Sequence, residues 1–116
     1  QVCIDDAEIE SLIGEKTSNF LRHFASQGWI EVKFMEKRTR KAWFSKSEEE
    51  VCWETWILVL NIVETRSDSE RTMLMRDMKK GLRDALQRIL NIVNEQKSHI
   101  PAIIGTDPFP YQVRRV

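Results

Sequence analysis

The sequence has few of the residues that carry catalysis or phosphate binding. Its four glycines are scattered singly among 116 residues, so there is no Gly-rich phosphate loop. The two histidines, His23 and His99, have no cysteine, serine or carboxylate at a spacing that would build a nucleophile–base pair. Two histidines and two separated cysteines also do not make a clustered metal-ligand set. We therefore expect a non-catalytic protein without a metal or other cofactor.

The chain also lacks an excess of either charge. Lys plus Arg number 18 and Asp plus Glu number 18, which argues against a general nucleic-acid binder, because such proteins usually carry a basic excess. No run approaches the ~18 apolar residues that a membrane span needs. The hydrophobic share of 41% is sufficient for a core, and we expect residues 1–116 to form one partial domain. Because the chain begins at Gln1 without a methionine, we expect further sequence before it.

The only two cysteines, Cys3 and Cys52, lie far apart in the sequence. Both stand next to apolar residues in strand-like segments, where a cysteine behaves as a small hydrophobic residue. We expect two buried free thiols, and hence a reducing compartment such as the cytoplasm.

The first half of the chain predicts one helix followed by two strands. Residues 1–4 read as the end of a strand, and Asp5 or Asp6 can cap a helix over about 6–26. Gly28 is a stop signal for that helix. Its apolar residues recur at helical spacing: Ile9, Leu12, Ile13, Phe20, Leu21 and Phe24.

Alternation of Ile30, Val32 and Phe34 with charged residues predicts a half-buried strand over 29–36. A polar loop is expected from 37 to about 50. The segment 51–65 is rich in β-forming residues, and its apolar run Trp56–Leu60 predicts a strand covered on both faces.

The second half predicts a long helix and a short edge strand. Ser67 and Glu70 fit a capping box, and the helix should continue to about Ser98 because Pro101 ends the pattern. Tyr111–Val113 can form the edge strand. The order is helix, strand, strand, helix, strand, which indicates an α+β fold with helices packed on an antiparallel sheet.

Two aromatic residues lie within a basic segment of the expected loop. Trp43 and Phe44 are adjacent and follow neither the helical nor the strand period, so we favour exposure and a protein partner, although loop aromatics can also fold inward. Basic residues around aromatics also suit a nucleic-acid groove or an anionic membrane. The following Glu48–Glu50 would neutralise much of this charge, which favours an ordinary solvated loop. The basic residues are Lys33, Lys37, Arg38, Arg40, Lys41 and Lys46.

Three segments carry a family resemblance: Lys41–Lys46 with its Trp-Phe pair, the Trp53–Trp56 strand start, and the helix end at Ile92–Pro101. In combination they resemble the autophagy-related protein 101 family, a HORMA-domain subunit of the autophagy-initiation kinase complex. The resemblance covers roughly residues 29–101.

The resemblance implies a HORMA-like antiparallel sheet with helices packed on it and no catalytic activity. It implies a heterodimer with the HORMA domain of autophagy-related protein 13, which this family stabilises, and contact with other subunits of the kinase complex. Trp43 and Phe44 correspond to the family's WF finger, which helps to recruit downstream factors to the autophagosome assembly site.

The sequence differs from the family pattern in two ways. In some relatives a residue separates the two aromatics. A full HORMA domain also begins with a strand, a helix and further strands that we do not find in this sequence, so no residue is assigned to the heterodimer surface. The alternatives are another HORMA adaptor that clamps a peptide with residues 102–116 or, less favoured, a basic-loop module for nucleic acid or a membrane surface.

Overall fold

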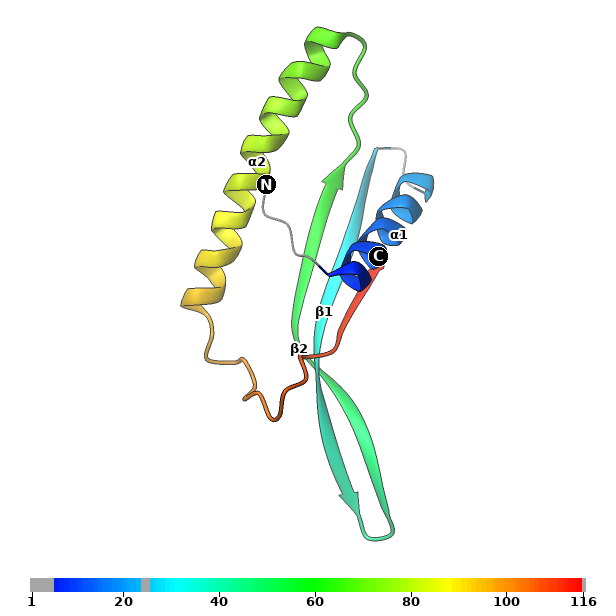
Figure 1. Ribbon diagram of the computed structural model, residues 1–116, viewed down its shortest axis with the longest axis vertical. Helices are drawn as coiled ribbons and strands as arrows, with labels where there is room; N and C mark the ends of the chain where they lie inside the picture. Colours follow the sequence, from blue (N-terminus) through cyan, green and yellow to red (C-terminus); the bar gives the residue numbers. More distant parts are fainter. Residues whose placement is uncertain (1–5, 24–25, 116) are drawn as a thin grey trace. The chain divides into compact units, whose positions relative to one another are not determined.

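A computed structural model describes residues 6–23 and 26–115 (Figure 1). It divides into two compact units, Gln1–Ile62 with Ala102–Val116, and Val63–Pro101. The predicted element order and the α+β class are confirmed, with two helices and an antiparallel three-stranded sheet. Residues 1–4, which include Cys3, lie outside the described residues, as do Asp5 and Phe24, so the expectations for them stay predictions. The elements are α1 (Ala7–His23), β1 (Gln27–Ala42), β2 (Ser45–Asn61), α2 (Asp68–Glu95) and β3 (Tyr111–Arg115).

The sheet of the first unit has the strand order β2-β1-β3, with both pairs antiparallel. β1 pairs with β2 along its whole length, whereas β3 pairs only with the segment Ile30–Phe34 of β1. The edge strand predicted at Tyr111–Val113 is therefore confirmed, and it extends to Arg115. The three-stranded part of the sheet is consequently short, and the β1–β2 pair continues well beyond it.

Helix α1 belongs to the same unit and is capped as the sequence predicts. The Asp6 carboxylate accepts hydrogen bonds from the backbone amides of Glu8 at 3.0 Å and Ile9 at 3.2 Å, which satisfies free donors of the first turn. Phe20 is buried, with 3% of its surface exposed, and is the main apolar anchor of the helix. Leu21, from the same predicted stripe, is 60% exposed, so the buried face is narrower than the spacing indicated.

The expectation that Trp56–Leu60 forms a covered, non-edge strand is wrong for the residues that the structure describes. β2 lies at the edge of the sheet, and Ile57 and Val59 are more than half exposed. Cys52, on the same strand, is exposed rather than buried. A continuous apolar run is typical of a central strand, but the run itself does not specify a neighbour on each side.

The second unit consists of α2 and its flanking segments. The Ser67 side chain accepts a hydrogen bond from the Glu70 amide at 3.1 Å, which confirms half of the predicted capping box. The Glu70 carboxylate instead accepts from the Arg66 amide at 2.8 Å, one residue before the expected partner. The helix ends at Glu95, short of the predicted Ser98. No helix among the described residues is both long and apolar enough to cross a bilayer.

Candidate interaction site at a hairpin tip

β1 and β2 extend beyond the three-stranded sheet as a two-stranded arm, which we call the stem (residues 35–42 and 45–52) (Figure 1). The register runs from Met35 opposite Cys52 to Ala42 opposite Ser45. The predicted polar loop over 37–50 is therefore wrong, because both sides of it are strand and only Trp43 and Phe44 form a turn. Lys and Glu are depleted in strands, so residue propensity concealed this pairing.

A β-bulge and an aromatic cluster mark the base of the stem. The register shifts between Phe34 and Met35, which leaves Trp53 as the extra residue of β2. The Trp53 ring lies 5.7 Å from that of Phe34 and 5.1 Å from that of Phe109, between ring centroids. The Met35 amide donates to the Pro110 carbonyl at 2.8 Å. Since a bulge bends and twists the strand pair, these contacts fix the direction in which the stem leaves the sheet.

Opposite charges face each other along the lower stem. Lys37 is paired with Glu50 and Arg38 with Glu49 in the β register, and residues directly opposite share a face of the sheet. The Arg40 guanidinium lies 3.4 Å from the Glu49 carboxylate, and both side chains are well exposed. Each such pair contributes only a few tenths of a kcal/mol, but together they favour this register over a slipped one.

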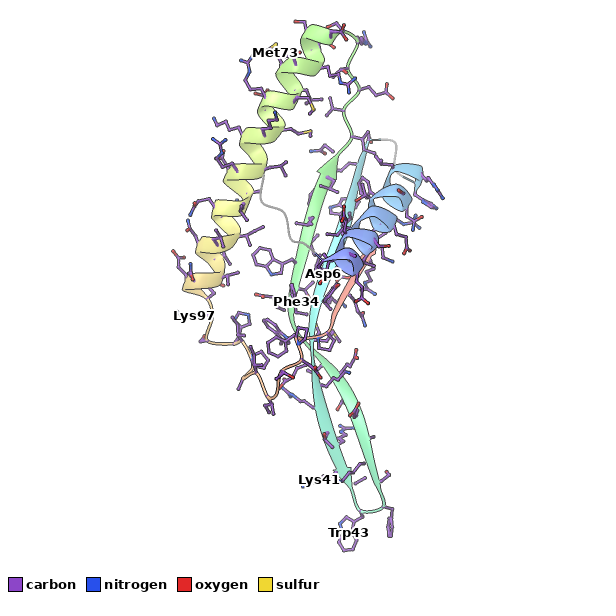
Figure 2. The ribbon with its side chains drawn as sticks, in the orientation of Figure 1. Asp6, Phe34, Lys41, Trp43, Met73 and Lys97 are labelled. Atoms are coloured by element: carbon purple, nitrogen blue, oxygen red, sulfur yellow. The ribbon has the colours of Figure 1, made fainter. Side chains whose placement is uncertain are left out.

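The tip of the hairpin consists of Trp43 and Phe44, and Figure 2 shows Trp43 at the far end of the stem. Each of the two side chains is 97% exposed. Two-residue hairpin turns usually need a positive φ and favour Asn-Gly, but neither Trp43 nor Phe44 has a positive φ. Two large aromatics therefore occupy a position where turn chemistry prefers small polar residues.

The exposed Trp43 and Phe44 rings are suited to contact with a binding partner. Their centroids lie 6.5 Å apart with the planes inclined at 50°, so they present two separate faces. Such an apolar surface is unfavourable in water and is stabilised when a partner covers it. Trp53 and Trp56, which the sequence assigns to structure, are instead half-buried in β2.

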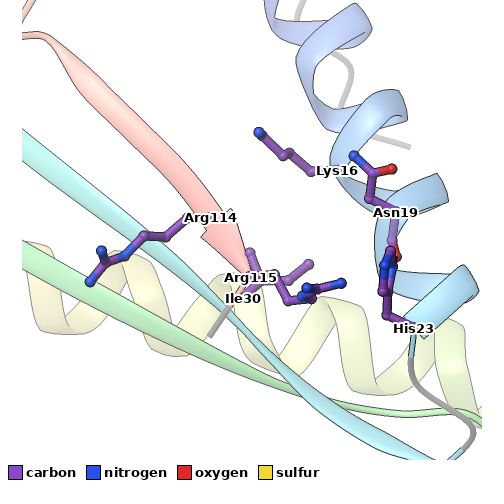
Figure 3. A pocket seen from close by; sticks show the side chains of 6 residues that line it. All are labelled: Lys16, Asn19, His23, Ile30, Arg114 and Arg115. Carbon is purple, nitrogen blue, oxygen red and sulfur yellow. The ribbon is translucent and has the colours of Figure 1, made fainter.

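A shallow basic pocket of about 350 Å³ lies elsewhere in the first unit, between α1 and the strands (Figure 3). The His23 Nδ1–H donates a hydrogen bond to the Asn19 backbone carbonyl at 2.7 Å. Figure 3 shows Arg115 extending towards α1 and Arg114 directed away from it. No pair of these groups suggests a nucleophile and base. The lining residues are Lys16, Asn19, His23, Ile30, Arg114 and Arg115.

Glu31 forms an ion pair that the sequence reasoning missed. Its carboxylate is buried and accepts a hydrogen bond from the Arg114 guanidinium, while the Lys33 ammonium lies 3.8 Å away. The hydrogen bond from Arg114 lowers the pKa of Glu31 below its usual value. Glu31 and Arg114 are directly opposite in the register, so the pair fastens β3 to β1. The alternation of β1 assigned Glu31 to the charged face, but only the position of β3 reveals its partner.

The comparisons with known proteins agree with the resemblance of the sequence. The family model described as "Autophagy-related protein 101" matches residues 1–107. A relative of that name from Arabidopsis thaliana is 25% identical over an alignment 132 residues long. The alignment covers 93% of this chain and 61% of the relative. The chain thus spans about three fifths of the length of that protein, and the HORMA-like form expected above is consistent with these matches. The chain belongs to the autophagy-related protein 101 family.

Proposed function

We propose that this protein is a non-catalytic adaptor in autophagy that recruits downstream factors through Trp43 and Phe44. Membership of the autophagy-related protein 101 family supports the role in autophagy. The observation that carries the recruitment role is the 97% exposure of both aromatics at the end of a stem fixed at its base. Trp is the residue type most enriched at binding hot spots, so the tip is the surface best suited to a partner.

The proposal includes a second surface, by which the protein pairs with the HORMA domain of autophagy-related protein 13 and stabilises it. It also places the protein in the cytoplasm, with recruitment to the autophagosome assembly site together with other subunits of the initiation kinase complex. Family membership supports this part. The stem extends away from the three-stranded sheet, so a partner can contact the tip without contacting the sheet (Figure 1).

The test is Trp43→Ala with Phe44→Ala in the full-length protein. A matched control is Ile103→Ala with Ile104→Ala, because these residues are also adjacent, apolar and exposed, at 70% and 91%, but lie outside the hairpin. Both variants should still co-elute with the autophagy-related protein 13 HORMA domain. Only the tip variant should lose recruitment of downstream factors to the assembly site in cells.

Two results would contradict the proposal in different ways. Normal recruitment by the tip variant would remove the role of the aromatics. Failure of the parent protein to co-elute with the HORMA domain of autophagy-related protein 13 would remove the heterodimer. The recruitment assay would then still decide the role of the tip, because it does not depend on co-elution.

A further inference from the structure

Two lysines lie next to the aromatic tip on one face of the stem. Lys41 and Lys46 are directly opposite in the β register, and like charges in that position destabilise a strand pair. Within residues 6–23 and 26–115, no carboxylate is within ion-pair distance of either ammonium group. An external anion next to the tip would relieve this repulsion.

The acidic residues of the hairpin lie further from the tip than the sequence suggested. Glu48 is opposite Thr39, Glu49 opposite Arg38 and Glu50 opposite Lys37. Glu48 follows Lys46 by two positions of extended strand, so their backbones are roughly 7 Å apart. Glu49 and Glu50 lie further down the stem, opposite Arg38 and Lys37. Near the tip, two lysines therefore stand against the single carboxylate of Glu48, which leaves a net positive charge there.

The two aromatic side chains are 97% exposed, so little of the surrounding protein restrains their rotamers. Among the described residues, each ring packs against the other. A rigid protein pocket would favour side chains already fixed in the bound orientation. A fluid bilayer interface makes no such demand, and Trp partitions there readily. Lysines beside inserted aromatics can meanwhile keep their ammonium groups at lipid phosphates.

We propose that the tip binds the surface of a bilayer that contains anionic lipid, with Trp43 and Phe44 entering the interface and Lys41 and Lys46 contacting the headgroups. The inference goes beyond the recruitment of protein factors, because it assigns the same tip a lipid ligand. The stem suits this role, since for several residues on each strand no other described element pairs with it, and within the first unit Trp43 lies at the end of the stem that is far from the three-stranded sheet (Figure 2).

The experiment measures binding of the full-length protein to vesicles by co-sedimentation. The probes are phosphatidylcholine vesicles and vesicles with roughly three parts phosphatidylcholine to one part phosphatidylserine, since the anionic lipid should attract the lysines. The parent should bind the anionic vesicles more tightly, and high salt should weaken that binding. Lys41→Gln with Lys46→Gln should reduce the affinity roughly 25-fold, about fivefold per lysine.

A control variant, Lys37→Gln with Arg38→Gln, removes the same charge from the lower stem. It should change the affinity less than the tip-lysine variant does, because Lys37 and Arg38 face acids across the strands. Trp43→Ala with Phe44→Ala should abolish most binding, whereas Ile103→Ala with Ile104→Ala should leave it unchanged. Equal thermal stability of the variants would show that the losses of vesicle binding do not arise from unfolding.

Three outcomes would overturn the inference. The first is that the parent does not sediment with anionic vesicles. The second is that the aromatic variant retains full affinity for them, and the third is that the two charge variants lose affinity equally. If the parent ignores vesicles while the aromatic variant still loses recruitment in cells, the tip binds a protein pocket, and the proposed function stands without the lipid ligand. If both recruitment and vesicle binding survive the aromatic substitution, both proposals fail.

Discussion

Removing both aromatics from the tip should leave the stability of the protein almost unchanged. A fully buried Trp or Phe replaced by Ala costs about 3–5 kcal/mol. Trp43 and Phe44 are each 97% exposed, so about 3% of each side-chain contribution is at stake, or roughly 0.1–0.2 kcal/mol per residue. Their mutual ring contact adds about 0.5 kcal/mol, the lower end of the range for aromatic pairs, because both rings are exposed. We expect the double Ala variant to lie within about 1 kcal/mol of the parent.

The measurement is urea-induced unfolding followed by circular dichroism, because a tryptophan substitution would alter a fluorescence signal. Trp53→Ala is the matched control, since it removes the same side-chain type from the stem base. There the ring is half-buried between Phe34 and Phe109, and its loss should cost about 2–4 kcal/mol. A tip variant that loses more than about 1.5 kcal/mol would show that the aromatics fold inward and that the exposed tip is wrong.

Three further predictions concern the turn, the Glu31–Arg114 ion pair and the exposed thiol. Trp43→Asn with Phe44→Gly should stabilise the hairpin by about 0.5–1 kcal/mol, seen as slower hydrogen exchange of stem amides; unchanged exchange would contradict the turn argument. The lowered pKa of Glu31 means that its contribution is present above the usual carboxyl pKa and is lost as pH falls through the lowered value. As the pH falls, the Glu31→Gln variant should therefore lose less stability than the parent, as measured by thermal unfolding. Parallel curves of stability against pH would exclude a role for the ion pair with Arg114. Cys52 is exposed, so Cys52→Ser should remove one rapidly reacting thiol in an Ellman titration of the native protein, and an unchanged count would refute this.

The elements that the sequence predicted well are those with strong local signals. The Ser67 cap is made within one turn of helix, so it needs no information about the rest of the chain. Asp6 is the same kind of case. The strand that begins near Trp29 was also found, because its alternation is a property of successive residues.

The stem could not be found in this way, because its stabilising contacts lie between strands. Lys37 and Glu50 have low strand propensity when each is considered alone, and only the register shows that they face each other. The edge position of β2 depends likewise on where β3 pairs. Burial of Cys52 was inferred from its neighbours in sequence, but a residue near a bulge at a sheet edge need not follow their burial.

The candidate site is the place where the sequence departs from what folding alone would favour. The lower stem obeys the rules of a stable hairpin, since Lys37 and Arg38 face Glu50 and Glu49. At the tip the turn residues are aromatics without positive φ, and the last charged pair is Lys opposite Lys. Two unfavourable choices within six consecutive residues, beside a stem that is otherwise optimised, are hard to attribute to stability. Each becomes favourable once an apolar and anionic partner covers the tip, so the same contact accounts for both.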